Sequence, residues 1–181
     1  DKDMSTLKVG TIQDHANSTT ALTIDSSGRV ARPKVPAWYY STGNAHSAHN
    51  GGTAYNPLLF GQRTVDTDGA GGTMIKGGTN HTIVIPVTGI YWVGYGGIKG
   101  NSSSTVGRMN MNRTSGSGES IFPACRGEEN SPYAEMYVAF VCNAVAGDEW
   151  QIQTTSDGMW MSGSNGTSNF NDPFWTGYLI G

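Results

Sequence analysis

Several residue types are scarce in this 181-residue sequence, and each shortage excludes a class of protein. Charged residues make up only 14%, well below the usual ~25%. Two Cys are too few for a disulfide scaffold. No apolar run approaches the ~20 residues of a bilayer-spanning helix. The formal net charge of -3 offers no basic surface to nucleic acid or to an anionic membrane.

Small polar residues are abundant instead. Gly, Asn, Ser and Thr account for 75 of the 181 positions, and these residues weaken helices or compete for the backbone in turns. An all-α fold is therefore excluded. Hydrophobic residues at 36% and aromatic residues at 10% are too many for a disordered chain. The composition predicts an all-β fold with long loops.

The apolar residues follow the period of two that strands show. Arg108–Asn112 and Trp150–Gln153 alternate apolar and polar residues, which indicates strands with one wet face. Ile83–Ile85, Ile90–Val93 and Met136–Val141 are apolar on both faces. A β-sandwich covers only one face of each sheet, so we expect a partner subunit to cover the other.

Residues 1–35 differ from the rest of the sequence. Leu22 and Ile24 alternate before a turn at Asp25–Gly28, and Val30 follows, which predicts a β-hairpin. Its apolar area is too small for independent folding, so we expect it to pack on copies of itself or on the main domain. Because the sequence begins at Asp1 without Met, we expect it to be part of a longer chain.

Four segments, taken in order, carry a family resemblance. They are PAWYYS at Pro36–Ser41, PVTGIYWVGY at Pro86–Tyr95, VAGDEWQI at Val145–Ile152 and FWTGYLIG at Phe174–Gly181. Together they resemble the jelly roll shared by the complement component 1q globular head and the tumour necrosis factor family. The resemblance covers residues 36–181 and implies an antiparallel jelly-roll β-sandwich that forms a homotrimer. The aromatic strands suggest a trimer interface at Tyr91, Val93, Tyr95, Tyr137, Trp175 and Tyr178.

The segment ALTIDSSGRV at Ala21–Val30 resembles connectors of phage tail-fibre and related virion proteins. Residues 1–35 show no collagen-like Gly-X-Y period, which favours a viral fibre over animal relatives. The sequence thus predicts the end of a fibre shaft (1–35) and a receptor-binding head (36–181) on a virion. Two alternatives are an inert trimerisation cap and a polysaccharide depolymerase. A depolymerase needs a pair of carboxylates, which the sequence does not make evident, so we expect no enzyme.

The predicted ligand is a cell-surface saccharide or protein, bound by loops at the end of the head away from the shaft. Counting ~8 strands from Pro36 assigns 42–55, 86–89, 114–132 and 156–173 to that distal end. The same count assigns 66–80, 99–104 and 146–149 to the shaft end. The candidate receptor-binding residues are Trp160, Met159, Tyr55, His46, His49, Arg126, Asn165 and Asn169.

No cofactor motif occurs in the sequence, and we expect no cofactor. His46 and His49 could meet near a threefold axis to bind a metal, or simply lie in a solvated loop. Asp66 and Asp68 begin like a calcium loop but lack its later ligands, so turn chemistry is the alternative for them. The two cysteines could form a bridge, although their small number favours free thiols.

Overall fold

The computed structural model of the chain describes residues 11–13, 20–24, 26–31, 35–41, 56–57, 60, 62–69, 72–76, 82–99, 108–126, 135–155, 159–160 and 173–181. Every regular element within these ranges is a β-strand, which confirms the predicted all-β class. None of these residues belongs to a helix long and apolar enough to span a membrane. The chain divides into two compact units, Asp1–Val35 and Pro36–Gly181. The roles expected for them, shaft and head, remain predictions.

The first unit contains a three-stranded antiparallel sheet. Its strands are β1 (Thr11–Gln13), β2 (Thr20–Ile24) and β3 (Val30–Ala31), in the order β1-β2-β3. The turn between β2 and β3 includes Gly28, whose φ of 76° suits glycine, so the predicted hairpin is confirmed. The side chains of Ile12, Ile24 and Val30 are all exposed.

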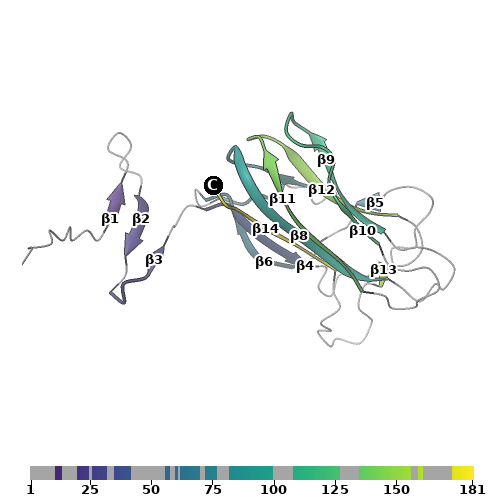
Figure 1. Cartoon of the computed structure of the whole chain (residues 1–181), viewed down its shortest axis with the longest axis horizontal. Helices are drawn as coiled ribbons and strands as arrows, with labels where there is room; N and C mark the ends of the chain where they lie inside the picture. Colours follow the sequence, from purple (N-terminus) through teal and green to yellow (C-terminus); the bar gives the residue numbers. More distant parts are fainter. Residues whose placement is uncertain are drawn as a thin grey trace, which may run out of the picture. The chain divides into compact units, whose positions relative to one another are not determined.

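The second unit, called the head below, consists of two antiparallel sheets whose strands run along its length (Figure 1). The six-stranded sheet has the order β11 (Glu135–Ala144), β8 (Gly89–Lys99), β14 (Phe174–Leu179), β4 (Ala37–Ser41) and β6 (Gln62–Thr67), with β13 (Met159–Trp160) also paired to β8. The five-stranded sheet has the order β10 (Ala124–Arg126), β9 (Arg108–Ser115), β12 (Glu149–Thr155) and β5 (Asn56–Pro57), with β7 (Ile83–Val84) also paired to β12.

Aromatic rings fill the space between the two sheets. Trp38 and Trp175 of the six-stranded sheet meet edge to face, with ring centroids 5.7 Å apart. Trp150 of the five-stranded sheet lies 6.3 Å from Trp38, also edge to face. Met109 and Met111 point into the same core, which confirms the predicted alternation along their strand. The inner faces of both sheets therefore share one hydrophobic core.

Hydrogen bonds define one end of the head, which we call the Pro36 end. There the Leu179 N–H donates to the Pro36 carbonyl at 3.0 Å, and the Ile90 N–H donates to the Gly181 carbonyl at 2.8 Å. Asp148, in the turn between β11 and β12, lies at the same end because its carbonyl accepts the Ile85 N–H at 2.8 Å. The opposite end, which we call the far end, contains the last residues of β4, β8, β10 and β12.

A buried carboxylate organises the Pro36 end. Asp148 is fully buried, and its Oδ1 accepts the N–H groups of Ser117 at 2.9 Å and Gly118 at 3.0 Å. Its Oδ2 accepts the Val145 N–H at 2.9 Å. Gly116, with a φ of 107°, lies so close that a Cβ there would meet the Asp148 side chain. One aspartate thus joins the turn after β9 to the turn before β12.

Three of the expected connections were assigned to the wrong end in whole or in part, and these are 86–89, 99–104 and 114–132. Ile83–Val84 is a two-residue strand that stays at the Pro36 end, where the Val84 N–H donates to the Met74 carbonyl at 2.7 Å. Segment 86–89 therefore lies at the Pro36 end, and segment 99–104 begins at the far end rather than the shaft end, because β8 ends there at Lys99. Within 114–132, the additional strand β10 separates a turn at the Pro36 end from a strand end at the far end. Because β7 is too short to cross the sheet, the alternating count is reversed from 86–89 onward, and the additional strand β10 restores it within 114–132.

Candidate functional site

The outer side of the six-stranded sheet carries a surface that we call the aromatic face. It consists of Tyr39, Val65, Ile90, Trp92, Tyr137, Val141, Phe174 and Tyr178, on all five strands of the sheet path. These residues alternate along their strands with core residues, because successive side chains point to opposite faces. Tyr39, Val65, Ile90, Tyr137, Val141 and Tyr178 are all exposed in the single chain.

Three rings stack across this face. The centroids of Tyr137 and Phe174 are 6.1 Å apart with planes inclined by 28°, and those of Phe174 and Tyr39 are 6.4 Å apart at 10°. Tyr137 and Phe174 lie on strands either side of β8, and both are paired with Gly96. A Cβ on Gly96 would lie 3.3 Å from the Phe174 ring. The two rings meet because β8 has no side chain between them.

A second stacked pair extends the aromatic face toward the Pro36 end. Trp92 and Tyr178 are direct cross-strand partners, and their centroids are 5.6 Å apart with planes inclined by 29°. The outward positions between the rings hold small residues: Ala37, Gly94, Ala139 and Thr176. The result is a broad apolar surface with fixed rings. Exposed patches of this kind mark protein–protein contact sites.

The outer side of the five-stranded sheet has the opposite chemistry, and we call it the amide face. It carries Asn110, Asn112, Gln151 and Gln153 on neighbouring strands. The Gln153 Nε2 donates to the Gln151 Oε1 at 3.2 Å, and the Gln151 Nε2 donates to the Thr82 Oγ1 at 3.4 Å. This face can donate and accept hydrogen bonds but has little apolar surface.

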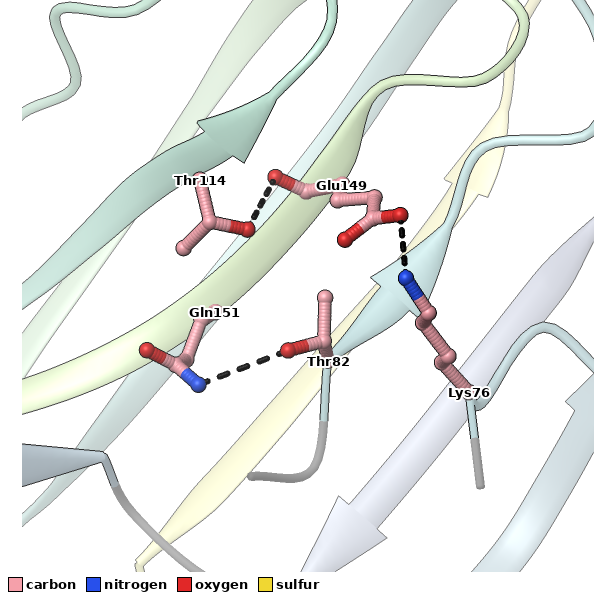
Figure 2. A network of polar contacts seen from close by, with 5 residues as sticks. All are labelled: Lys76, Thr82, Thr114, Glu149 and Gln151. Carbon is pink, nitrogen blue, oxygen red and sulfur yellow. Dashed lines mark hydrogen bonds and ion pairs between the residues drawn. The ribbon is translucent and has the colours of Figure 1, made fainter. Parts of the chain in front are cut away.

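Figure 2 shows the part of the amide face that lies near the start of β12. The Lys76 Nζ donates to the Glu149 Oε1 at 2.6 Å, and the Thr114 Oγ1 donates to the Glu149 carbonyl at 3.3 Å. The first contact ties the segment before β7 to the start of β12, and the second joins β9 to β12. Both contacts stabilise the fold.

Four residues expected at the trimer interface lie in the core instead. Tyr91, Val93, Tyr95 and Trp175 have 0% of their surface exposed within one chain, so this expectation is wrong for them. The Tyr95 hydroxyl shows why: it donates to the Pro123 carbonyl and accepts the Met111 N–H at 3.0 Å, which links the two sheets. Burial raises the pKa of Tyr91 to about 12 and also raises the pKa of Tyr95. Tyr137 and Tyr178 are on the aromatic face, and their role at an interface stays a prediction.

The structure describes three of the eight predicted receptor-binding residues. His46, His49, Tyr55, Asn165 and Asn169 lie outside the described residues. Met159 and Trp160 form β13, which pairs with Lys99 and Ile98 of β8, so their backbone lies at the far end of the six-stranded sheet. Arg126 is exposed at the far end of the five-stranded sheet. The predicted receptor-binding site therefore stays a prediction.

Asp66 and Asp68 serve the fold. The Asp66 Oδ1 accepts the Tyr40 hydroxyl and the Met74 N–H, each at 2.7 Å. The Asp68 Oδ1 accepts the Gly72 N–H at 2.8 Å. Burial and the bond to Asp66 raise the pKa of the Tyr40 hydroxyl. Among the described residues no three His, Cys, Asp or Glu side chains gather as metal ligands, and these contacts support the turn alternative for the two aspartates.

Cys125 and Cys142 are both buried free thiols, as the low cysteine count predicted. Burial raises the pKa of the Cys125 thiol to about 11 and that of the Cys142 thiol to about 12. A thiol must lose its proton to act as a nucleophile. Neither cysteine is therefore activated for chemistry.

Comparison with known proteins shows the fold of the chain and no more. No protein-family model matches the sequence, and no curated protein matches it. Among solved structures, murine APRIL at pH 5.0 superposes with a TM-score of 0.57 at 13% identity, over 81% of this chain and 100% of that one. The globular domain of zebrafish complement 1qA superposes with a TM-score of 0.53 at 14% identity, over 81% of this chain and 98% of that one. The chain thus has the complement 1q and tumour necrosis factor-like jelly-roll fold, as predicted.

Several residues of the two outer faces were not predicted as site residues from the sequence. Tyr39, Trp92 and Phe174 belong to the aromatic face, yet only their aromatic character marks them in the sequence. The alternating glycines Gly94 and Gly96 were a usable signal, because glycine inside a strand often marks a close approach of other groups. Arg108, the cross-strand partner of Arg126, had no such signal.

Proposed function

We propose that the chain is a binding protein that attaches a virion to its host. In this proposal residues 36–181 are the receptor-binding head of a homotrimeric fibre, of the kind found in phage tails, and residues 1–35 are the end of its shaft. The observation that carries the proposal is the aromatic face. It gives the head a large exposed apolar surface of the kind that joins copies of a chain, which supports an assembled binding module.

The aromatic face supports a second copy of the chain as its occupant. Its rings are already fixed by stacking, so little side-chain entropy is lost when a partner covers them. Interfaces of permanent oligomers are apolar and rich in aromatic residues. Closed symmetry is the rule for such assemblies, and three copies are proposed because the complement 1q and tumour necrosis factor-like resemblance implies a trimer.

The first unit gives independent support for assembly. Ile12, Ile24 and Val30 are exposed on a three-stranded sheet that is too small to bury them alone. Ile24 and Val30 are cross-strand partners, so they form one apolar strip. Three copies of the chain could cover these strips together, as a fibre shaft requires.

Receptor binding is assigned to the far end of the head. The strand ends that lead into segments 42–55, 127–134 and 156–172 lie there, and loops on a rigid scaffold are common recognition sites. The proposed ligand is a saccharide or protein of the host cell surface. His46, His49, Tyr55, Arg126, Met159, Trp160, Asn165 and Asn169 remain the proposed contacts.

The proposal is tested with the purified full chain. Light scattering coupled to size exclusion should give about three times the 19.2 kDa chain mass. Fluorescently labelled trimer should bind intact cells of one bacterial strain in a panel, and unlabelled trimer should compete for that binding. A trimer that binds no strain would instead be a structural cap, and a shortened surface polysaccharide after incubation would indicate a depolymerase. A monomer at micromolar concentration would refute the assembly.

A further inference from the structure

Two arginines face each other at the far end of the five-stranded sheet. Arg108 is the first residue of β9, Arg126 is the last residue of β10, and the two are direct antiparallel partners. Their neighbours Met109 and Cys125 point into the core, so both arginine side chains are on the outer side of the sheet. Directly opposed side chains have Cβ atoms about 5 Å apart. The two guanidinium groups can therefore reach the same ligand atom.

The two arginines have no anionic partner among the described residues. Like charges in directly opposed positions destabilise a sheet. Within the described residues neither guanidinium has a carboxylate partner, and the Nε of Arg108 is buried without a hydrogen-bond acceptor. A buried donor of a charged group that finds no acceptor is costly, so such groups are normally paired. An anion held between the two arginines would remove both costs.

The surroundings of the pair suit a sugar. Next to it along the same outer side, Asn110 is paired with Ala124 on one strand and with Gln153 on the other. Ala124 leaves room beside Arg126, and the two amides donate and accept hydrogen bonds as sugar hydroxyls require. Guanidinium groups bind carboxylate or sulfate through paired N–H donors.

We propose that Arg108 and Arg126 bind the acidic group of an anionic saccharide, with Asn110 and Gln153 contacting its hydroxyls. This inference rests on the proposed attachment function and names the class of its ligand. Nucleic acid is a poor alternative occupant, because the chain has a net charge of -3 and a phosphate backbone needs a longer basic track. The shared chemistry of the ligand is a carboxylate or a sulfate ester.

The test uses the full chain and tetragalacturonate, with its methyl ester as the uncharged control. Calorimetry should show affinity for the acid that is at least about tenfold higher than for the ester. Arg108→Gln and Arg126→Gln should each lower affinity for the acid about tenfold or more. Lys76→Gln, which makes the same change in net charge at the Pro36 end, should leave it unchanged. A sulfated tetrasaccharide of the same length distinguishes a sulfate from a carboxylate site.

Several outcomes would overturn this site. Equal affinity for acid and ester, no affinity for either charged sugar, or an equal loss in Lys76→Gln would each exclude it. Calorimetric binding of inorganic sulfate while no sugar binds would show a site for small anions only. A lower melting temperature for both arginine variants would show that a carboxylate of the chain or of another copy already pairs with them. If the arginine site is excluded in this way but the trimer still binds cells, the proposed attachment function is retained and only the saccharide site is wrong.

Discussion

Tyr137→Asp is the sharpest test of assembly through the aromatic face. Tyr137 keeps 60% of its surface exposed in a single chain, although its ring stacks on Phe174. Full burial of a large apolar side chain contributes about 1.5–3 kcal/mol, so covering the exposed part contributes about 1–2 kcal/mol per subunit. Three subunits lose about 3–6 kcal/mol, which is about 100-fold to 10,000-fold in the trimer association constant. The buried carboxylate adds a further desolvation cost.

The assay measures mass by light scattering across a dilution series, together with thermal melting. The variant should remain folded, because within the chain it loses only a ring contact worth about 0.5–1.5 kcal/mol. Ile121→Asp is the matched control, since Ile121 is 85% exposed and lies outside the aromatic face. A Tyr137→Asp protein that keeps the trimer mass on dilution would refute the reasoning. So would equal dissociation of the Ile121→Asp control.

Three further predictions concern packing, thiols and the first unit. Gly177→Ala should lower the melting temperature by several degrees, because a Cβ there would overlap the Trp38 ring and lie 2.8 Å from a backbone oxygen. Cys125 and Cys142 should react with a thiol reagent only after unfolding. Burial raises their pKa values in the folded protein to about 11 and about 12, so their contribution to the free energy of unfolding is complete below the ordinary thiol pKa of ~8.5. That contribution is lost as the pH rises toward the folded pKa values, which melting curves at alkaline pH will show. Deletion of residues 1–35 should leave a head that melts cooperatively at nearly the same temperature, and aggregation of the shortened chain would contradict the division at Pro36.

The periodicity of the sequence predicted well which segments form strands. It predicted less well which side of each strand is buried. In Arg108–Asn112 the polar residues mark the outer side, and Met109 and Met111 are in the core as expected. In Ile90–Val93 both sides are apolar, so the sequence does not distinguish the buried Tyr91 from the outward Trp92. The distinction depends on pairing with distant strands. The wrong interface residues follow directly from this ambiguity.

The prediction of which end of the head each connection occupies was wrong in places for a related reason. The apolar run at Ile83–Ile85 reads as a full strand, yet only Ile83–Val84 pairs with β12 before Pro86. Conversely, Ala124–Arg126 is a real strand within a segment whose glycines predicted a loop. Very short strands are stabilised by their neighbours rather than by their own pattern. Sequence periodicity therefore cannot count them.

The two outer faces suggest how the head divides assembly from recognition. Burial of the aromatic side chains on the six-stranded sheet is favourable because it removes apolar surface from water. Burial of the amides and arginines on the five-stranded sheet is unfavourable unless a polar ligand replaces the hydrogen bonds that they make with water. A trimer formed through the aromatic face would leave the outer side of each five-stranded sheet uncovered by other copies, with three copies of the Arg108 and Arg126 pair. Linked sites bind a repeating saccharide with an avidity above that of any single site. Each arginine pair can then be individually weak and still hold a cell surface firmly.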